Sequence, residues 1–288
     1  MSVLVRRHSS ADGELEIAQG RPDVRLSSRV HGYHGWRERM NGPLRRRVPA
    51  STAVTIVMSF DGGPHLLDSS ESGRAGARLG SFVAGPTEFP LTTEHSGISY
   101  GVEVSFTPPG AGAFLDLPLD ELAQRQVPVD EILGAEGRRL LERLHDATSW
   151  ERRFALLDGV VAARQGRNRR HDLGIAWAWE CLHATGGQVS VSALAAELGW
   201  SGRAFGERFR ERIGMTPKRA ARIVRFERAA ERLARDPRDG LAGLAYACGY
   251  ADQAHLTREF RAFAGTTPGD FAAELLPADA GIAAPESA

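Results

Sequence analysis

The feature that most constrains this chain is a repeat within its C-terminal third. Leu194-Ala195…Leu198-Gly199-Trp200 returns as Leu244-Ala245…Cys248-Gly249-Tyr250, and Phe209-Arg210…Gly214…Thr216-Pro217 returns as Phe260-Arg261…Gly265…Thr267-Pro268. In each copy a glycine follows one apolar helical segment and a second helical periodicity comes after it. A repeated pattern of this kind indicates two copies of one small helical unit.

Each copy carries the signals of two helices joined by a tight turn. The turn glycines are Gly199 and Gly249, because a turn with positive φ is easiest without a Cβ atom. Ser201 and Asp252 are the predicted N-caps of the second helices, and Ser190 is the predicted N-cap of the first helix in the first copy. Apolar residues at helical spacing predict one buried face on each second helix; they are Phe205, Phe209, Ile213, Leu256, Phe260 and Phe263.

A long helix is predicted between the two copies. Thr216-Pro217 has the order of an N-cap followed by a first-turn proline, and Asp236-Pro237 ends the helical pattern. About 19 residues at about 1.5 Å each give a rod of roughly 28 Å. Successive major grooves on one side of B-DNA are about 34 Å apart. A rod of this length can therefore hold two groove-binding helices side by side on one duplex.

These motifs resemble the signature of the AraC/XylS family of bacterial transcription regulators. The resemblance implies a DNA-binding domain over 172–276 with two helix-turn-helix units. It implies that the second recognition helix reads base edges with the residues at the outward positions, which are Gln253, Ala254, His255, Thr257 and Arg258. The corresponding positions of the first recognition helix hold Arg203, Gly206 and Glu207. Arg210 and Arg261 are expected to contact phosphates.

The first recognition helix departs from the usual family pattern. A larger polar residue followed by arginine is usual where Gly206 and Glu207 stand. Glutamate can accept a hydrogen bond from cytosine but repels phosphate. Whether the first unit reads bases is therefore left open.

The N-terminal half is predicted to be rich in β-structure. Residues 54–60 and 81–84 are short apolar runs, and residues 98–106 alternate between apolar and polar side chains. Gly and Pro clusters separate these runs, as in a small sandwich or barrel. Amphipathic helices are predicted over Val129–His145 and Trp150–Ala163. The expected fold class is α+β, with a β-rich domain followed by an all-α domain.

Residues 31–38 and 101–106 resemble the cupin-like sensor domain found in many AraC/XylS regulators. This resemblance implies an effector pocket in the barrel and dimerisation through the two helices, whose apolar faces could instead pack on the sensor's own sheet. Tyr33 and Trp36 are the candidate effector-binding residues, with core packing as the alternative. No cofactor and no metal are expected. His31 and His34, with His95 or Glu103, are candidate metal ligands, but their spacing fixes no third ligand.

The expected domain boundaries follow from these patterns. Residues 1–25 are polar and expected to be poorly ordered, and 26–165 form the sensor and dimerisation domain. Residues 166–171 are the expected linker, 172–276 the DNA-binding domain, and 277–288 a disordered tail.

Composition excludes several classes of protein. The 36 basic and 36 acidic side chains cancel, so overall charge indicates no polyanionic partner, although basic residues exceed acidic ones from Arg203 to Arg238. The sequence lacks the common hydrolase, metalloprotease and nucleotide-binding motifs, so no enzymatic activity is expected. A DNA-repair protein with a reactive thiol is disfavoured because Cys181 and Cys248 lie on apolar helical stretches. With no long apolar run and no signal peptide, we expect a cytoplasmic protein without a membrane partner.

The sequence thus predicts a sequence-specific, double-stranded-DNA-binding transcription regulator, activator or repressor, that responds to a small-molecule effector. RNA polymerase and a second copy of the chain are further candidate partners. The alternative is an architectural DNA-binding protein without an effector. A ligand that changes DNA affinity would discriminate between the two.

Overall fold

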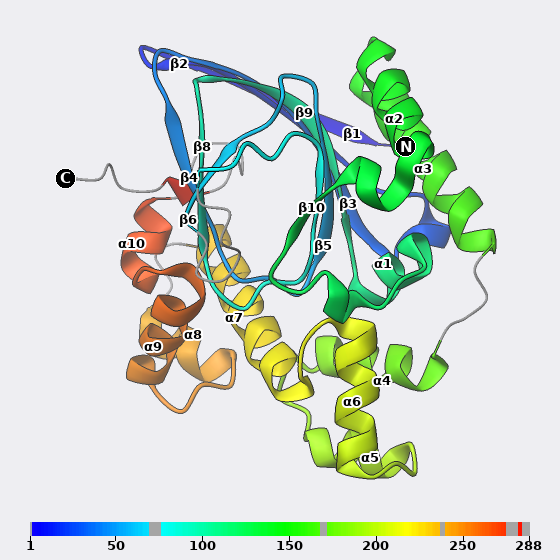
Figure 1. Cartoon of the computed structure of the whole chain (residues 1–288). Coiled ribbons are helices and arrows are strands. Elements are labelled where there is room, and N and C mark those ends of the chain that lie inside the picture. Colours follow the sequence, from blue (N-terminus) through cyan, green and yellow to red (C-terminus); the bar gives the residue numbers. More distant parts are fainter. Residues whose placement is uncertain (1, 69–75, 168–171, 237–239, 275–281, 284–288) are drawn as a thin grey trace.

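The computed structural model describes residues 2–68, 76–167, 172–236, 240–274 and 282–283 (Figure 1). A β-rich N-terminal domain is followed by an all-helical C-terminal domain, which confirms the predicted fold class. Among the described residues, no helix combines the length and the hydropathy that crossing a bilayer requires.

The larger sheet of the N-terminal domain is antiparallel and has seven strands in the order β1-β2-β3-β9-β5-β7-β10. Their bounds are β1 (Val3–Ser10), β2 (Gly13–Gly20), β3 (Val30–Met40), β5 (Val54–Ser59), β7 (Phe82–Ala84), β9 (Ile98–Phe106) and β10 (Gln126–Pro128). The three runs predicted as strands therefore coincide with β5, β7 and β9.

A smaller sheet faces the larger one and closes the barrel (Figure 1). Its order is β11-β4-β8-β6, with β4 (Leu44–Val48), β6 (His65–Asp68), β8 (Leu91–His95) and β11 (Ile282–Ala283). Two short 3₁₀ segments, η1 (Val24–Leu26) and η2 (Leu119–Glu121), complete the domain.

The pleat of the larger sheet separates an apolar face from a polar one. On β9, Val102, Val104 and Phe106 are buried in a core shared with three helices, α1 (Pro108–Leu115), α2 (Val129–Asp146) and α3 (Trp150–Arg167). Successive residues of a strand point to opposite faces, so Glu103 and Ser105 face the inside of the barrel. The two predicted amphipathic helices are α2 and α3, and their apolar faces pack on the larger sheet of their own domain.

Helix α1 was not predicted, because Pro108-Pro109-Gly110 was interpreted as a turn between elements. The structure shows that Thr107 is the N-cap of this helix and that its hydroxyl accepts a hydrogen bond from the Gly110 amide at 3.2 Å. Proline is tolerated in the first helical turn because the amides there have no intrahelical acceptor.

The N-terminal segment 1–25 was expected to be poorly ordered, and this prediction is wrong. Strands β1 and β2 form a hairpin that pairs with β3 along its length. Polar side chains misled the prediction, because an edge hairpin is held by its backbone hydrogen bonds and keeps one face in solvent. The expected linker 166–171 overlaps the end of α3, and its residues 168–171 lie outside the described part. The expected tail from 277 also lies outside it, except for β11, which pairs with β4.

Within the described residues, the C-terminal domain contains seven helices. They are α4 (Leu173–Ala184), α5 (Val191–Glu197), α6 (Gly202–Ile213), α7 (Pro217–Arg235), α8 (Leu241–Ala247), α9 (Gln253–Ala264) and α10 (Pro268–Ala273). Helices α5 and α6 form the first helix-turn-helix unit, and α8 and α9 form the second. The turn glycines, Gly199 and Gly249, have φ of 67° and 74°. The predicted caps Ser190, Ser201 and Asp252 each accept a hydrogen bond from a first-turn amide.

Helix α7 joins the two units and shares one core with both. Phe226 on α7 packs against Phe260 and Phe263 of α9, with ring centroids 5.0 and 5.6 Å apart. Arg222 on α7 also holds the carboxylate of Glu259, which is buried on α9, at 2.7 Å. The long helix and the second recognition helix therefore form one rigid block.

Candidate functional site

Helix α9 presents a polar surface at its N-terminal end. Asp252 caps the helix, and its carboxylate accepts a hydrogen bond from the His255 amide at 2.6 Å. Four of the predicted contact residues are exposed on this helix, namely Gln253, Ala254, Arg258 and Arg261. Their spacing places them on the side opposite the buried Leu256, Phe260 and Phe263.

The two remaining predicted residues of α9 are half-buried and bonded locally. The His255 ring accepts a hydrogen bond from the Ala251 amide at 3.5 Å and contacts the Tyr250 ring edge-on at 5.2 Å. The Thr257 hydroxyl donates to the Gln253 carbonyl at 2.9 Å. Both side chains therefore support the start of the helix, and Gln253 and Arg258 have the freer polar groups.

Helix α6 presents fewer free groups. Arg203 and Glu207, one turn apart and exposed, form an ion pair at 2.9 Å, so the acid neutralises the base that was predicted to face DNA. Gly206 has open space where a Cβ atom would stand. Arg210 is exposed one turn further along. Of the residues predicted in the first unit, Arg210 is therefore the clearest candidate for a cationic contact with DNA.

The C-terminal end of α6 packs on the N-terminal domain. Gly214, which ends this helix with φ of 87°, lies so close to Pro86 and the Leu119 carbonyl that a Cβ would approach them to 2.8 and 3.0 Å. Figure 1 shows α6 reaching from the first unit up to the region below α1. The N-terminal domain is therefore in direct contact with the first helix-turn-helix unit.

Helix α7 makes a second contact with the N-terminal domain. The Glu227 carboxylate accepts hydrogen bonds from the Ser51 hydroxyl and the Thr52 amide, both at 2.9 Å, and from the Thr52 hydroxyl at 3.1 Å. Burial between the domains raises the pKa of Glu227, against the lowering effect of these donors. An ion pair between Arg219 and Glu88 at 2.8 Å extends the contact.

The second unit is tied to the smaller sheet as well. Arg47 on β4 pairs with Glu274, just after α10, at 2.7 Å. The Ala50 amide donates to the carbonyl of Phe263 in α9 at 2.7 Å, and Ala50 itself is part of the helical domain's core. The two domains thus share backbone, ionic and apolar contacts.

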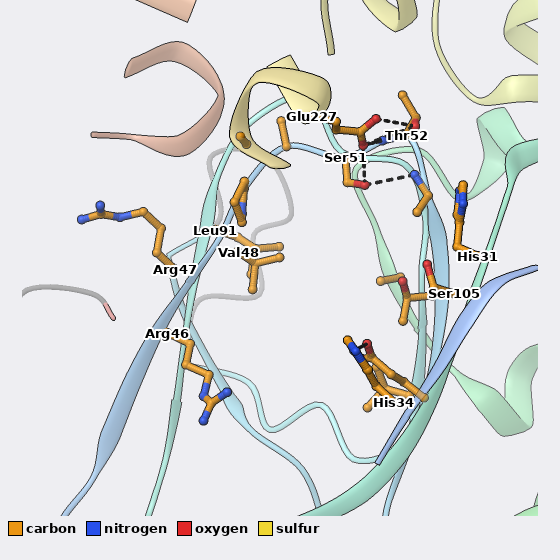
Figure 2. A pocket seen from close by; sticks show the side chains of 18 of the residues that line it. His31, His34, Arg46, Arg47, Val48, Ser51, Thr52, Leu91, Ser105 and Glu227 are labelled. Atoms are coloured by element: carbon orange, nitrogen blue, oxygen red, sulfur yellow. Dashed lines mark hydrogen bonds and ion pairs between the residues drawn. The ribbon is translucent and has the colours of Figure 1, made fainter. Parts of the chain in front are cut away.

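A cavity of about 1240 Å³ lies between the two sheets and α7 (Figure 2). The barrel contributes most of its lining, and Val224, Glu227 and Glu231 of α7 complete one wall. In Figure 2, His34 and Ser105 project from the large sheet, whereas Arg46, Arg47, Val48 and Leu91 lie across the space on the small sheet. Both domains therefore border the same cavity.

Polar residues gather at one end of the barrel. Glu38 is buried and forms an ion pair with Arg46, and His95 lies 3.6 Å from the other Glu38 oxygen. Burial raises the pKa of Glu38, and burial together with Arg46 lowers the pKa of His95 to about 4. Within the described ranges, no three His, Cys, Asp or Glu side chains converge as a metal site.

Tyr33 does not line the cavity, which corrects its assignment as a candidate effector-binding residue. It is 1% exposed on the opposite face of β3, stacks on Phe154 and donates its hydroxyl to Asp158 at 2.6 Å. Alternation along the strand separates it from Trp36, which does line the cavity.

The family comparison agrees with the helical geometry. Residues 194–274 match a family model described as a helix-turn-helix domain. This part of the chain is an AraC-type helix-turn-helix domain. The matched segment runs from α5 to the residue after α10 and contains both units.

Solved structures of ToxT from Vibrio cholerae are similar to the chain beyond its AraC-type domain. One from strain O395 is 10% identical, covers 80% of this chain and 96% of its own, and has a TM-score of 0.45. Apo ToxT from strain SCE256, a point variant, is 11% identical, covers 94% and 100%, and has a TM-score of 0.48. Unsaturated fatty acid bound wild-type ToxT is 11% identical, covers 80% and 94%, and has a TM-score of 0.45. No curated protein matches the sequence.

Two residues that the sequence analysis did not single out for these roles border the cavity. Glu103 stands on the polar side of an alternating strand, and the sequence analysis considered it only as a metal ligand. Glu227 is one acid within a basic helix, and nothing in its local sequence indicates that Ser51 and Thr52 meet it.

Proposed function

We propose that this protein is a sequence-specific transcription regulator whose N-terminal domain binds a small-molecule effector. The observation that carries the proposal is the shared cavity: the helix that joins the two helix-turn-helix units also forms part of the cavity wall. A ligand in that position touches the element that sets the geometry of DNA binding.

DNA recognition is assigned first to α9. Gln253 can bond adenine and Arg258 can bond guanine with two hydrogen bonds each, and both side chains are exposed. Ala254 leaves room for close approach to a base. Arg261 on α9 and Arg210 on α6 are assigned to phosphates, which fix the register of the protein on the duplex. His255 and Thr257 are assigned a supporting role, because their polar atoms already have partners within the unit.

The first unit is assigned mainly to affinity. Arg203 must exchange its bond with Glu207 for one with DNA, which lowers its net contribution. Gly206 offers no side chain to a base. Base reading by α6 is therefore expected to be weaker than base reading by α9.

Regulation follows from differential binding. A ligand shifts an equilibrium between two arrangements only if it binds one of them better. A bound ligand makes different contacts with α7 when this helix is docked on the barrel and when it has left the barrel. The cavity can therefore couple ligand binding to DNA binding. RNA polymerase and a second copy of the chain remain proposed partners from the family resemblance alone.

Selection of bound fragments from genomic DNA by the purified full chain tests the proposal. We expect a recurring motif and a steep loss of affinity with salt. Recovery of fragments without a common motif would contradict sequence-specific regulation. A ligand that binds the protein raises its melting temperature. If no such ligand changes the affinity for DNA, the architectural alternative is favoured.

A further inference from the structure

The inner face of the large sheet brings an aromatic ring next to a carboxylate. In the pairing of β3 with β9, Trp36 stands opposite Gly101 and His34 stands opposite Glu103. The Trp36 ring covers Gly101, where a Cβ would come within 2.4 Å of it, and the indole NH donates to Ser99 at 2.8 Å. Residues two apart on a strand share a face, so Glu103 and His34 adjoin the ring.

The carboxylate of Glu103 is open to the cavity. It lies 3.4 Å from His34 Nδ1, and both side chains keep part of their surface accessible, 29% for Glu103 and 43% for His34. Gln19 approaches the other ring nitrogen of His34 at 3.2 Å, so the imidazole is held from both sides. Figure 2 shows His34 projecting into the cavity from the large sheet. This wall therefore presents a hydrogen-bond acceptor with negative charge.

The arginines of the barrel lining already have acidic partners. Both arginines that it contributes to the lining have acidic partners, Arg46 with Glu38 and Arg47 with Glu274. The third lining arginine, Arg228, belongs to α7 and lies against Gly186, on the same helix as the acidic Glu227 and Glu231. His31 and His183 also line the cavity, with ring centroids 6.2 Å apart. An anion inside the barrel would compete with existing ion pairs.

The rest of the barrel lining suits an apolar body. Val57, Leu79 and Phe82 form a buried cluster, and Trp36 and Leu91 pack against it. All five line the cavity. A cation over the face of tryptophan gains an electrostatic attraction, and the gain is larger where water is excluded.

We infer that the cavity selects a cationic ligand with a flat apolar body, an aromatic amine, whose ammonium group binds Glu103 beside the Trp36 ring. The inference rests on the proposed effector role of the cavity and specifies its ligand class. The ring of such a ligand would pack on the apolar cluster, and its ammonium would donate hydrogen bonds to the carboxylate.

Three indole probes test the inference by isothermal titration with the full chain: tryptamine, its neutral isostere 3-propylindole, and the anionic indole-3-propionate. They share the indole ring and differ in charge at the end of the side chain. We expect tryptamine to bind at least about tenfold more tightly than the carboxylate, the factor of one favourable charge contact. Equal affinities, a preference for the carboxylate, or binding of no probe would overturn the inference.

Variants place the effect on the named residues. Glu103→Gln keeps the shape of the side chain and should reduce tryptamine affinity about tenfold while leaving 3-propylindole unchanged. Trp36→Leu should weaken both probes. Glu142→Gln, an exposed position on α2, is the matched control and should change neither. If Glu103→Gln also weakens the binding of 3-propylindole, the neutral probe, the role of Glu103 is overturned.

The proposed function has a separate outcome. Fragment selection and gel shift use the chain without any probe, so DNA recognition can stand while the ligand class fails. A preference for indole-3-propionate that also alters DNA affinity would keep the cavity as the effector site and overturn only the aromatic amine.

Discussion

Thr52 gives both its backbone amide and its hydroxyl to the Glu227 carboxylate, at 2.9 and 3.1 Å. Thr52 precedes β5 in the N-terminal domain, and Glu227 lies on the helix between the two helix-turn-helix units. This pair therefore fastens the barrel to the element that fixes the distance between the recognition helices.

Replacing Glu227 with alanine should loosen this contact. The substitution leaves buried donors of Ser51 and Thr52 without their acceptor, a loss of about 1–3 kcal/mol for an unmet buried group. We expect a lower melting temperature in scanning calorimetry and faster proteolysis between the domains. Glu231→Ala on the same helix, where the carboxylate is exposed, is the control. An unchanged melting temperature in Glu227→Ala would show that the contact is not stabilising.

The raised pKa of Glu227 gives the contact a pH dependence. An acid whose pKa is higher in the folded state stabilises that state below its unfolded pKa and loses this contribution as pH rises through the folded pKa. Wild type should therefore lose stability relative to Glu227→Gln as pH rises from about 4.5, the ordinary glutamate range. His95, whose pKa is lowered, contributes stability that is lost as pH falls, which is the opposite effect. Because both proteins contain His95, the difference in stability between them reports on Glu227. A stability difference that is constant with pH, or a wild type that gains stability relative to Glu227→Gln as pH rises, would contradict this account.

Arg258 and Arg261 should act differently on DNA although both are exposed on α9. Arg258→Ala should cost about 1–3 kcal/mol on the selected site and relax the preference at one base position. Arg261→Ala should weaken all sequences alike and reduce the salt slope by about 1. Competition binding over a library of single-base variants separates the two results. An unchanged base profile in Arg258→Ala would remove it from the reading residues.

Removing the acid on α6 should strengthen DNA binding. Glu207→Ala frees Arg203 from its ion pair and removes a charge that repels phosphate, so the affinity for the selected site should rise and the salt slope should steepen. Gel shift at several salt concentrations measures both. Weaker binding would instead assign Glu207 to a base, as an acceptor from cytosine.

The helical half of the structure was predictable because its signals are local. The caps Ser201 and Asp252, the turn glycines and the buried faces all follow from residues a few positions apart. The N-terminal half was predictable only as single strands. Which face of β3 holds Tyr33 and which holds Trp36 depends on helices packed far along the chain.

The contact of Glu227 with Thr52 could not be predicted, since it joins residues from two domains and neither has a distinctive neighbourhood. The helix that begins at Pro108 was missed for a different reason. Its double proline has the same local pattern as a turn. Only Thr107, the N-cap residue that precedes the prolines, indicates that a helix begins there.

Hydroxyl-radical footprinting of the selected site tests the central claim most directly, because the account requires α7 to hold two recognition units on one face of a duplex. We expect two protected segments about 10–10.5 base pairs apart on the same face, with the stronger protection lost in Arg258→Ala. A single protected segment, or two on opposite faces, would contradict the proposed mode of binding.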